Sequence, residues 1–415
     1  MAEGGSSMVK KRICLITPGH VSSCPRIVKE ADALVEAGYE VTLVSGRNFE
    51  PVLALDRVIL SRARWNHREV PSNRGLRAGL RRVARKGLQV LQPRKIGVAA
   101  AELFVTPGLP SLIEAAVQTK ADLYHAHCLG GLPAAAAASR ATGKPFSFDV
   151  EDFHEEESDR VLANPTERAA VACLMQEHLP HAAFVTAASP LIADACSERY
   201  GVKAVPLLNA FLPQKSPASG DIHPFTTDNP ARLYWFSQTI GPGRGLEEMI
   251  DVMGRLKTPA LLQLRGFVSQ AYRAVLLSLA AERKVAIAFL TPGSPDEMVK
   301  LAAEADLGLS LEQSAPPNRD ICLTNKVFVY LAAGIPQLMS KTRAQGAFGK
   351  EIDQAAVLAD LSNSAATAQQ LDALLGNPAA LEAARQQAVA MGERFSWQRE
   401  KVKFLELVET QLSHG

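Results

Sequence analysis

Short apolar segments alternate with helical patterns along almost the whole of this chain of 415 residues. The first series opens with an apolar strand at residues 13–16, a helix that begins at Pro25 and stops at Gly38, and a second strand at residues 41–44. A strand–helix–strand order predicts a parallel sheet with its ligand site at the carboxyl ends of the strands. A second series begins at Arg232, so we expect an α/β protein with two doubly wound domains.

The length of the chain also favours two domains, because 415 residues exceed what one ordinary hydrophobic core contains. We expect residues 1–10 to be disordered or derived from cloning, and residues 11–212 to form the first Rossmann-like domain. A stretch at 213–230, rich in Pro, Ser, Gly, Asp and Thr, is typical of a linker. The second Rossmann-like domain is expected at residues 231–395, followed by a last helical segment at 396–415.

Composition narrows the class of protein. The hydrophobic content of 47% and charged content of 21% are typical of globular proteins, and the net charge is only +2. The six cysteines form no C-x-x-C pair, and no histidines cluster at metal-ligand spacing. The N-terminus lacks the pattern of a signal peptide, and no apolar run reaches the ~18 residues of a membrane helix. We therefore expect a reduced, cytoplasmic protein with no metal site.

One helix start is a candidate phosphate site. Thr324 is placed to cap a helix with an apolar stripe that ends at Gly334, and a short buried strand follows. Thr324, Asn325 and Lys326 bring a hydroxyl, an amide and an amine to the first turn, where the free N–H groups and the helix dipole attract an anion. The alternative is an ordinary capped helix that binds nothing.

Histidines and acids collect where successive predicted strands end. A strand at residues 122–127 finishes at His127, and a strand at residues 145–150 contains Asp149 and is followed by Glu151 and Asp152. These carboxylates could act as a base or as sugar ligands, or could simply cap a helix. Gly19 follows the first strand, where the backbone could approach a ligand closely or make a plain turn.

Residues 57–95 are strongly basic and contain a single acid, Glu69. Leu76, Leu80, Val83 and Val90 or Leu91 recur at helical spacing, opposite arginines and Lys86. A basic amphipathic helix of this kind suits an anionic membrane surface. Nucleic acid would fit the charge, but Trp65 is the only aromatic residue in the tract, so we expect no nucleic-acid partner. A solvated surface is the remaining interpretation. The basic residues are Arg57, Arg62, Arg64, Arg68, Arg74, Arg77, Arg81, Arg82, Arg85, Lys86, Arg94 and Lys95.

With these features placed, nearly the whole sequence resembles the retaining glycosyltransferases of the GT-B fold, the group 1 or family 4-like enzymes. The motifs, in order, are PRIVKEA at residues 25–31 with GYEV at 38–41, HAH at 125–127, FDVED at 148–152, GRGLE at 243–247, NKVFVY at 325–330 with AAGIP at 332–336, and FSW at 395–397. The resemblance implies two facing Rossmann-like domains, with a last helix that crosses back to the first.

The resemblance also implies a reaction and a set of roles. A sugar would pass from a nucleotide diphosphate sugar, with UDP or GDP expected, to a hydroxyl, with retention and with no cofactor or metal. Arg244 stands where the family usually has a lysine on the diphosphate, Lys326 lies at the phosphate-binding helix start, and His127 matches a histidine that contacts the donor sugar. Further donor-side residues are Gly19, Gly243, Gly266, Glu312, Thr324 and Asn325, and the acceptor-side residues are Arg26, Asp149, Glu151 and Asp152.

Two departures from the family pattern affect the donor site. Ser237 and Gln238 occupy the place of an arginine that precedes the diphosphate lysine in many members. Ile321 and Val329 occupy the positions of two glutamates, the second of which binds the donor. Losing a buried hydrogen bond to a charged acceptor costs about 1.5–3 kcal/mol, so either Glu312 or another group compensates, or donor binding is weak.

Three hypotheses follow. The first is a glycosyltransferase of surface or envelope polysaccharide synthesis, acting on a glycan or lipid-linked acceptor and docked at the inner leaflet through the basic tract. The second is a non-catalytic relative that binds a partner or glycan, motivated by Val329 and Gln238. The third is a nucleotide-sugar 2-epimerase, which Glu151 and Asp152 would allow.

Overall fold

The structure is a computed structural model, and it describes residues 10–47, 52–71, 76–91, 93, 95–106, 108–214 and 224–413. Residues 1–9 and the central part of the expected linker, 215–223, lie outside these described residues, as do Arg74 and Arg94 of the basic tract. The contacts divide the chain into two compact units. The N-terminal unit comprises Met1–Leu207 together with Lys401–Gly415, and the C-terminal unit comprises Leu208–Glu400.

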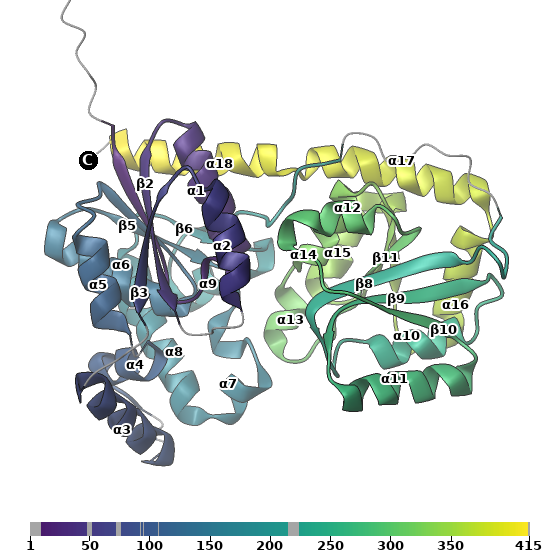
Figure 1. Ribbon diagram of the computed structural model, residues 1–415, viewed down its shortest axis with the longest axis horizontal. Helices are drawn as coiled ribbons and strands as arrows, with labels where there is room; N and C mark the ends of the chain where they lie inside the picture. The colour runs from purple at the N-terminus through teal and green to yellow at the C-terminus, as the bar shows by residue number, and fades with distance from the viewer. Residues whose placement is uncertain are drawn as a thin grey trace, which may run out of the picture. The chain divides into compact units, whose positions relative to one another are not determined.

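The N-terminal unit is built on a parallel sheet of seven strands in the order β3-β2-β1-β4-β5-β6-β7 (Figure 1). The chain fills the sheet outward from β1 in one direction and then from β4 in the other, so the topological switch point lies between β1 and β4. The strands are β1 (Arg12–Thr17), β2 (Glu40–Arg47), β3 (Asn66–Pro71), β4 (Leu123–His127), β5 (Phe146–Val150), β6 (Val185–Ala187) and β7 (Ala204–Pro206).

Helices connect these strands and cover the sheet. The central strands β4 and β5 are buried along their whole length, as expected of parallel strands covered on both faces. The helix α1 begins at Pro25, whose fixed φ suits a first helical position, and it buries Ile27, Ala31 and Leu34. The helices are α1 (Pro25–Glu36), α2 (Leu53–Arg62), α3 (Leu76–Leu91), α4 (Val98–Val105), α5 (Leu109–Val117), α6 (Leu132–Thr142), α7 (Asp159–Ala163), α8 (Pro165–His178) and α9 (Pro190–Tyr200).

The C-terminal unit repeats this plan with six parallel strands in the order β10-β9-β8-β11-β12-β13, so its switch point lies between β8 and β11. The strands are β8 (Ala231–Ile240), β9 (Ala260–Val268), β10 (Ala286–Leu290), β11 (Leu307–Ser310), β12 (Gln337–Ser340) and β13 (Ala356–Ala359). The helices are α10 (Leu246–Met253), α11 (Gln270–Arg283), α12 (Met298–Ala302), α13 (Pro317–Ile321), α14 (Asn325–Ala332), α15 (Arg343–Ile352), α16 (Ser364–Leu375), α17 (Pro378–Arg394) and α18 (Trp397–Ser413).

The two doubly wound sheets confirm the predicted fold class, and three local features were not foreseen in the sequence analysis. No strand was predicted in the basic tract, yet β3 forms there as an edge strand whose only side chain described as buried is Val70. Strand β8 continues past Phe236 to Ile240 through an irregularity in its pairing with β9. The helix α14 was predicted to bury one stripe, whereas it is buried on all sides from Lys326 to Ala332.

Among the described residues, no single helix is long and apolar enough to cross a membrane. Within the same described ranges, the pair α4 and α5 reaches the required length and composition when taken together, but the two helices are bent by 94° relative to each other.

The last helix, α18, starts within the C-terminal unit and continues as part of the N-terminal unit from Lys401 onward. Phe404 and Val408 are fully buried in the N-terminal core, where they pack with Ile13, Leu34 and Leu123. The Phe404 ring also lies against His125, with 5.4 Å between ring centroids.

We therefore expect Phe404→Ala to lower the free energy of unfolding of the N-terminal unit by about 3–5 kcal/mol, because it removes a buried aromatic ring and leaves a cavity. Val402→Ala, on the same helix at a position 51% exposed, should change it by less than about 0.5 kcal/mol. Differential scanning calorimetry of the full chain measures both. Similar effects of the two substitutions would show that α18 does not complete this core.

Candidate functional site

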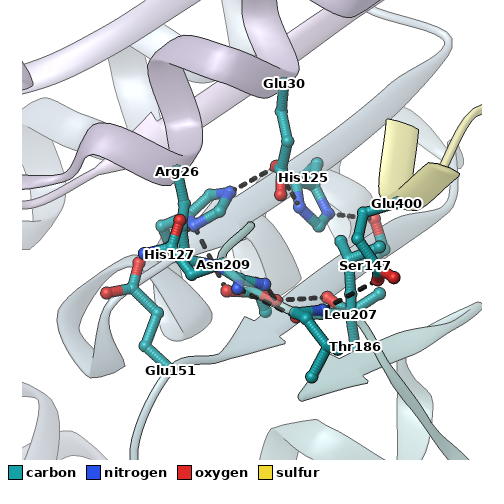
Figure 2. Close-up of polar contacts among 12 residues, drawn as sticks. Arg26, Glu30, His125, His127, Ser147, Glu151, Thr186, Leu207, Asn209 and Glu400 are labelled. Carbon is teal, nitrogen blue, oxygen red and sulfur yellow. Dashed lines mark hydrogen bonds and ion pairs between the residues drawn. The ribbon is translucent and has the colours of Figure 1, made fainter. Parts of the chain in front are cut away.

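A cluster of buried acidic and basic side chains lies at the carboxyl end of β4 in the N-terminal unit. The register of the parallel sheet places His127 of β4 beside Asp149 of β5, and Asp149 beside Thr186 of β6. From the neighbouring helix α1, Arg26 and Glu30 reach the same strand ends, because residues four apart lie on one face of a helix (Figure 2). The cluster thus lies beside the switch point between β1 and β4, where doubly wound sheets bind ligands.

Arg26 joins three elements through its guanidinium group. Its Nη2 lies 2.6 Å from Oδ1 of Asp149, and its Nη1 donates to the carbonyl oxygen of Leu207 at 2.9 Å. The hydroxyl of Thr186 donates to the same Asp149 oxygen at 2.5 Å. Arg26 is 4% exposed and Asp149 0%, so this is a buried ion pair with additional hydrogen bonds.

His127 lies between carboxylates on both sides of its ring. Nε2 is 2.7 Å from Oε2 of Glu30, while Nδ1 is 3.2 Å from Oε1 of Glu151 and 3.6 Å from Oδ2 of Asp149. His125 also approaches Glu30, with 3.1 Å between its Nε2 and Oε2.

The pKa values of this cluster are shifted in the directions that the contacts imply. Burial favours the neutral form of His127, but the negative charges around it, that of Glu30 first, raise its pKa well above the ordinary value. Burial would raise the pKa of Glu151, yet its hydrogen bond to His127 and the charge of that ring lower it to about 2. The pKa of Glu30 is lowered for the same reason. His127 is therefore an imidazolium at neutral pH, and both glutamates are ionised.

Two groups of side chains in this cluster have the spacing of metal ligands, Cys24 with His127 and Glu151, and Glu30 with His125 and His127. Both groups use His127, and each of its ring nitrogens already faces a carboxylate oxygen. A metal ion would have to displace a proton from one of those contacts, so the geometry favours an ion-pair network over a metal centre.

The ring of His127 is fully buried, and both of its nitrogens face carboxylates. Asp149 and Arg26 are also buried. The donor-side contact expected of His127 and the acceptor-side contacts expected of Arg26 and Asp149 stay predictions. Glu151 and Asp152, just beyond β5, are only partly buried. Gly19 has no positive φ, and a Cβ there would meet no atom within 4 Å, so its backbone conformation does not require glycine.

In the C-terminal unit, the chain between β8 and α10 forms a short glycine-rich loop at the switch point. Gly243 and Gly245 adopt left-handed φ values of +69° and +72°, which glycine tolerates best. Arg319 of α13 fixes the loop by donating to the carbonyl oxygen of Gly243 at 2.6 Å. Arg244 is half-buried and makes no hydrogen bond or ion pair with the described residues, so its guanidinium group is available to a ligand.

The start of α14 lies near the same edge of this sheet. The amine of Lys326 is 3.3 Å from Oε1 of Glu312, which follows β11, and 5.5 Å from the centroid of the Trp235 ring. Thr324 occupies the N-cap position, as predicted, but its hydroxyl caps nothing and is buried without a partner. Asn325 is exposed and accepts a 2.5 Å hydrogen bond from Asn209. A buried hydroxyl without a partner at a helix start suits an anionic ligand.

Three other donor-side positions have structural roles. Gly266 has φ of +148°, and a Cβ there would lie 2.3 Å from the carbonyl oxygen of Ser237, so glycine is required where β9 passes the irregular part of β8. Val329 is 1% exposed and packs with Tyr234, Tyr330 and other apolar side chains. Ile321 is 5% exposed. The positions of the two missing glutamates are therefore occupied by buried apolar side chains.

The sequence analysis assigned no role to Glu30, His125 or Arg319, although Glu30 and His125 lie within the motifs that it quoted. A signal for Glu30 was present, because it stands four residues after Arg26 on the helix that carries the PRIVKEA motif. No comparable signal marked Arg319, whose role depends on the approach of α13 to the glycine loop.

Comparisons with known proteins agree with this geometry. Residues 25–208 match the Glycosyl transferase 4-like domain family. A search of curated protein sequences finds no match. Among solved structures, the HepE protein of Anabaena, crystallised with UDP and glucose and with UDP-glucose, has a TM-score of 0.69 and 15% identity over 96% of this chain and 100% of its own.

Two further structures have the same fold. Sucrose-phosphate synthase from Thermosynechococcus elongatus has a TM-score of 0.67 and 14% identity over 98% of this chain and 100% of its own. The lipopolysaccharide outer core galactosyltransferase WaaB has a TM-score of 0.62 and 12% identity over 96% of this chain and 99% of its own. Residues 25–208 thus resemble the glycosyltransferase 4-like domain, and the fold of the chain is GT-B.

We expect Arg26→Met to destabilise the N-terminal unit by about 3–5 kcal/mol, because Asp149 would remain buried without its guanidinium partner. Arg64→Met is the matched control, since it removes an arginine from a pair with Glu36 whose side chains are 61% and 48% exposed. It should cost at most about 1 kcal/mol. Urea unfolding measures the difference, and equal losses would contradict the structural role assigned to Arg26.

Proposed function

We propose that this protein is a retaining glycosyltransferase that moves a sugar from a nucleotide diphosphate sugar, with UDP or GDP as the nucleotide, to a hydroxyl group of a glycan or lipid-linked acceptor. The observation that carries the proposal is the anion site at the switch point of the C-terminal sheet. There, within the described part of the chain, neither the Arg244 guanidinium group nor the buried Thr324 hydroxyl has a hydrogen-bond partner. The complexes of HepE with UDP and UDP-glucose support a nucleotide-sugar donor.

The chemistry that this site can supply is electrostatic. Negative charge develops on the diphosphate as the bond to the sugar breaks, and cations or N–H groups fixed in advance stabilise that charge. Arg244, Lys326 and the first N–H groups of α14 would serve this purpose without a metal. Glu312 holds Lys326 in place, but it also offsets part of the positive charge, so Arg244 carries the larger share of the interaction.

The acceptor is proposed to lie at a membrane surface, because α3 exposes apolar side chains beside basic ones. Val83, Val90 and Leu91 are 69%, 82% and 78% exposed, and Lys86 is exposed among them. Leu88 and Arg85 instead face the body of the unit, where Arg85 lies over the Phe104 ring. Arg85 therefore does not belong to the polar face predicted for it. The side chains of residues 76–82 lie outside the described residues. An anionic leaflet, as in surface-glycan synthesis, would accommodate both kinds of side chain.

A second candidate is a non-catalytic sugar-binding or scaffold protein. Val329 favours it, because an apolar cluster fills the position where many family members bind the donor. A 2-epimerase is a third possibility, and it would release an epimerised nucleotide sugar without any acceptor. For the proposed transferase, the anomeric configuration of the product, read by NMR, should match that of the donor.

We expect one of UDP, GDP, TDP, ADP and CMP to stabilise the protein against thermal unfolding, by about 2.7 kcal/mol at a hundredfold excess over Kd. Arg244→Ala should weaken binding of that nucleotide about tenfold or more, because a charge-assisted hydrogen bond is lost. The control is Arg255→Ala, at an exposed position just after α10. If no nucleotide stabilises the protein at millimolar concentration, the donor site is not functional and the scaffold candidate takes precedence.

We also expect the protein to sediment with vesicles that contain anionic phospholipid, and to do so less at high salt. Val90→Glu should reduce vesicle binding about tenfold. The substitution replaces an apolar side chain that would enter the membrane by a carboxylate, which the negatively charged lipid surface repels. Val275→Glu is the matched control, since Val275 is 53% exposed on α11 of the other unit. Equal binding of both variants would argue against docking through α3.

A further inference from the structure

In the cluster at the end of β4, Glu151 is the carboxylate whose side chain is partly exposed to solvent. Its Oε1 accepts from Cys24 Sγ at 3.1 Å and from His127 Nδ1 at 3.2 Å. Its other oxygen makes no hydrogen bond or ion pair with the described residues, and the side chain is 26% exposed. His127 and Asp149 are 0% exposed and Glu30 is 1% exposed. Within this cluster, Glu151 is therefore the carboxylate most accessible to a ligand.

The protons on His127 follow from its neighbours. An ionised carboxylate can only accept hydrogen bonds, so a ring with carboxylates at both nitrogens must donate from both. Glu30, 2.7 Å from Nε2, supplies the contact on the side away from Glu151, as Figure 2 shows. Glu30 and Glu151 are thus linked through one imidazole ring, although they come from α1 and from the segment after β5.

We propose that Glu30 is a positioning residue: by holding His127 doubly protonated, it keeps the Glu151 carboxylate ionised and oriented to accept hydrogen bonds from the hydroxyl groups of a sugar. This inference rests on the glycosyltransferase function proposed above and deepens it. It assigns Glu151 to sugar binding and not to proton abstraction. A general base works best with a pKa near the operating pH, whereas the hydrogen bond from His127 holds that of Glu151 at about 2, despite its burial.

Several other charged or titratable groups also face His127. Arg26 of α1 lies beside Asp149, and Cys24 precedes the same helix. His125 of β4 contacts the His127 ring edge-on, with 4.9 Å between centroids, and also approaches Glu30. Asp149 of β5 faces Nδ1 at 3.6 Å. The first cause acting on the pKa of His127 is burial, which lowers it, and the charge of Glu30 is the first that raises it.

The sign of the expected effect follows from this balance. Glu30→Gln removes the negative charge at Nε2, so the pKa of His127 falls and the ring loses its second proton near neutral pH. Above that new pKa, the His127 ring that contacts Glu151 is neutral. Below it, the ring is positively charged again. A purely structural defect would not be reversed by acid.

The first arm of the test is NMR titration of the histidine rings. The wild-type His127 resonance, assigned by its absence in His127→Gln, should stay that of an imidazolium through pH 7.5. In Glu30→Gln it should titrate at least one pH unit lower. Glu36→Gln, at an exposed position on the same helix, is the control and should leave it unchanged. Unchanged titration in Glu30→Gln overturns the proposal, whatever the activity of the protein.

The second arm is kinetic and uses release of nucleoside diphosphate from UDP-glucose and GDP-mannose. Glu30→Gln should lower kcat/KM about tenfold at pH 7.5 and recover to within about twofold of the wild type below the new pKa of His127. Glu36→Gln should match the wild type at every pH. Loss of activity without recovery in acid would contradict the positioning role.

Glu151→Gln separates binding from base catalysis and perturbs a partly exposed site, so it provides a variant with less risk of misfolding than Glu30→Gln. If Glu151 binds the sugar, this substitution should raise KM about tenfold with a smaller change in kcat. If Glu151 is a general base, the substitution would lower kcat about 100-fold or more, and that result would overturn the assignment. If the wild type consumes neither donor, the proposed function fails on these substrates, and the NMR arm still decides the link between Glu30 and His127.

Discussion

The removal of several charges from water at one edge of the N-terminal sheet is the constraint on which the rest of that unit depends. An isolated buried carboxylate would cost several kcal/mol, so Glu30 and Asp149 can exist there only with His127 and Arg26 beside them. These partners belong to α1, β4 and β5. These ion pairs form only if α1 turns the face with Arg26 and Glu30 toward the strands. They also require the register that places His127 of β4 beside Asp149 of β5.

The C-terminal unit handles charge differently. Its helix α14 is enclosed on all sides, and Lys326 is the only charged side chain that it buries. The carboxylate of Glu312 and the face of the Trp235 ring contact the amine, so the positive charge of Lys326 is largely compensated. Arg244, held on a loop whose glycines take left-handed backbone angles, remains uncompensated. The cluster at the end of β4 thus offers one carboxylate oxygen of Glu151, and the glycine-rich loop offers a guanidinium group that has no partner among the described residues.

Sequence patterns predicted those parts of the structure whose cause is local. Apolar runs such as that of β1, the proline that begins α1 and the glycine that ends α14 act through backbone geometry and short-range burial, so they are visible in the chain itself. Strand β3 was missed because an edge strand with mostly exposed side chains lacks that signal.

The site was only partly predictable for a related reason. The strand-end position of His127 could be predicted, but its enclosure could not, because a histidine followed by acids has the same pattern whether its ring faces solvent or a glutamate on another helix. Glu30 and Arg319 act through contacts between segments distant in the chain. Val329 was identified as a departure from the family pattern, and only the packing around it shows that apolar side chains fill that position.

The helix α18 has a consequence for how the chain is made. The N-terminal unit needs Phe404 and Val408 to fill its core, and both residues follow the whole C-terminal unit in the chain. Domains usually fold as units in the order of their synthesis. Here the first unit must wait, with part of its apolar interior uncovered, until the whole second unit has been translated. The N-terminal core therefore stays exposed to aggregation or to chaperones while the C-terminal unit is synthesised, and a chain cut before α18 would lack the side chains that close that core.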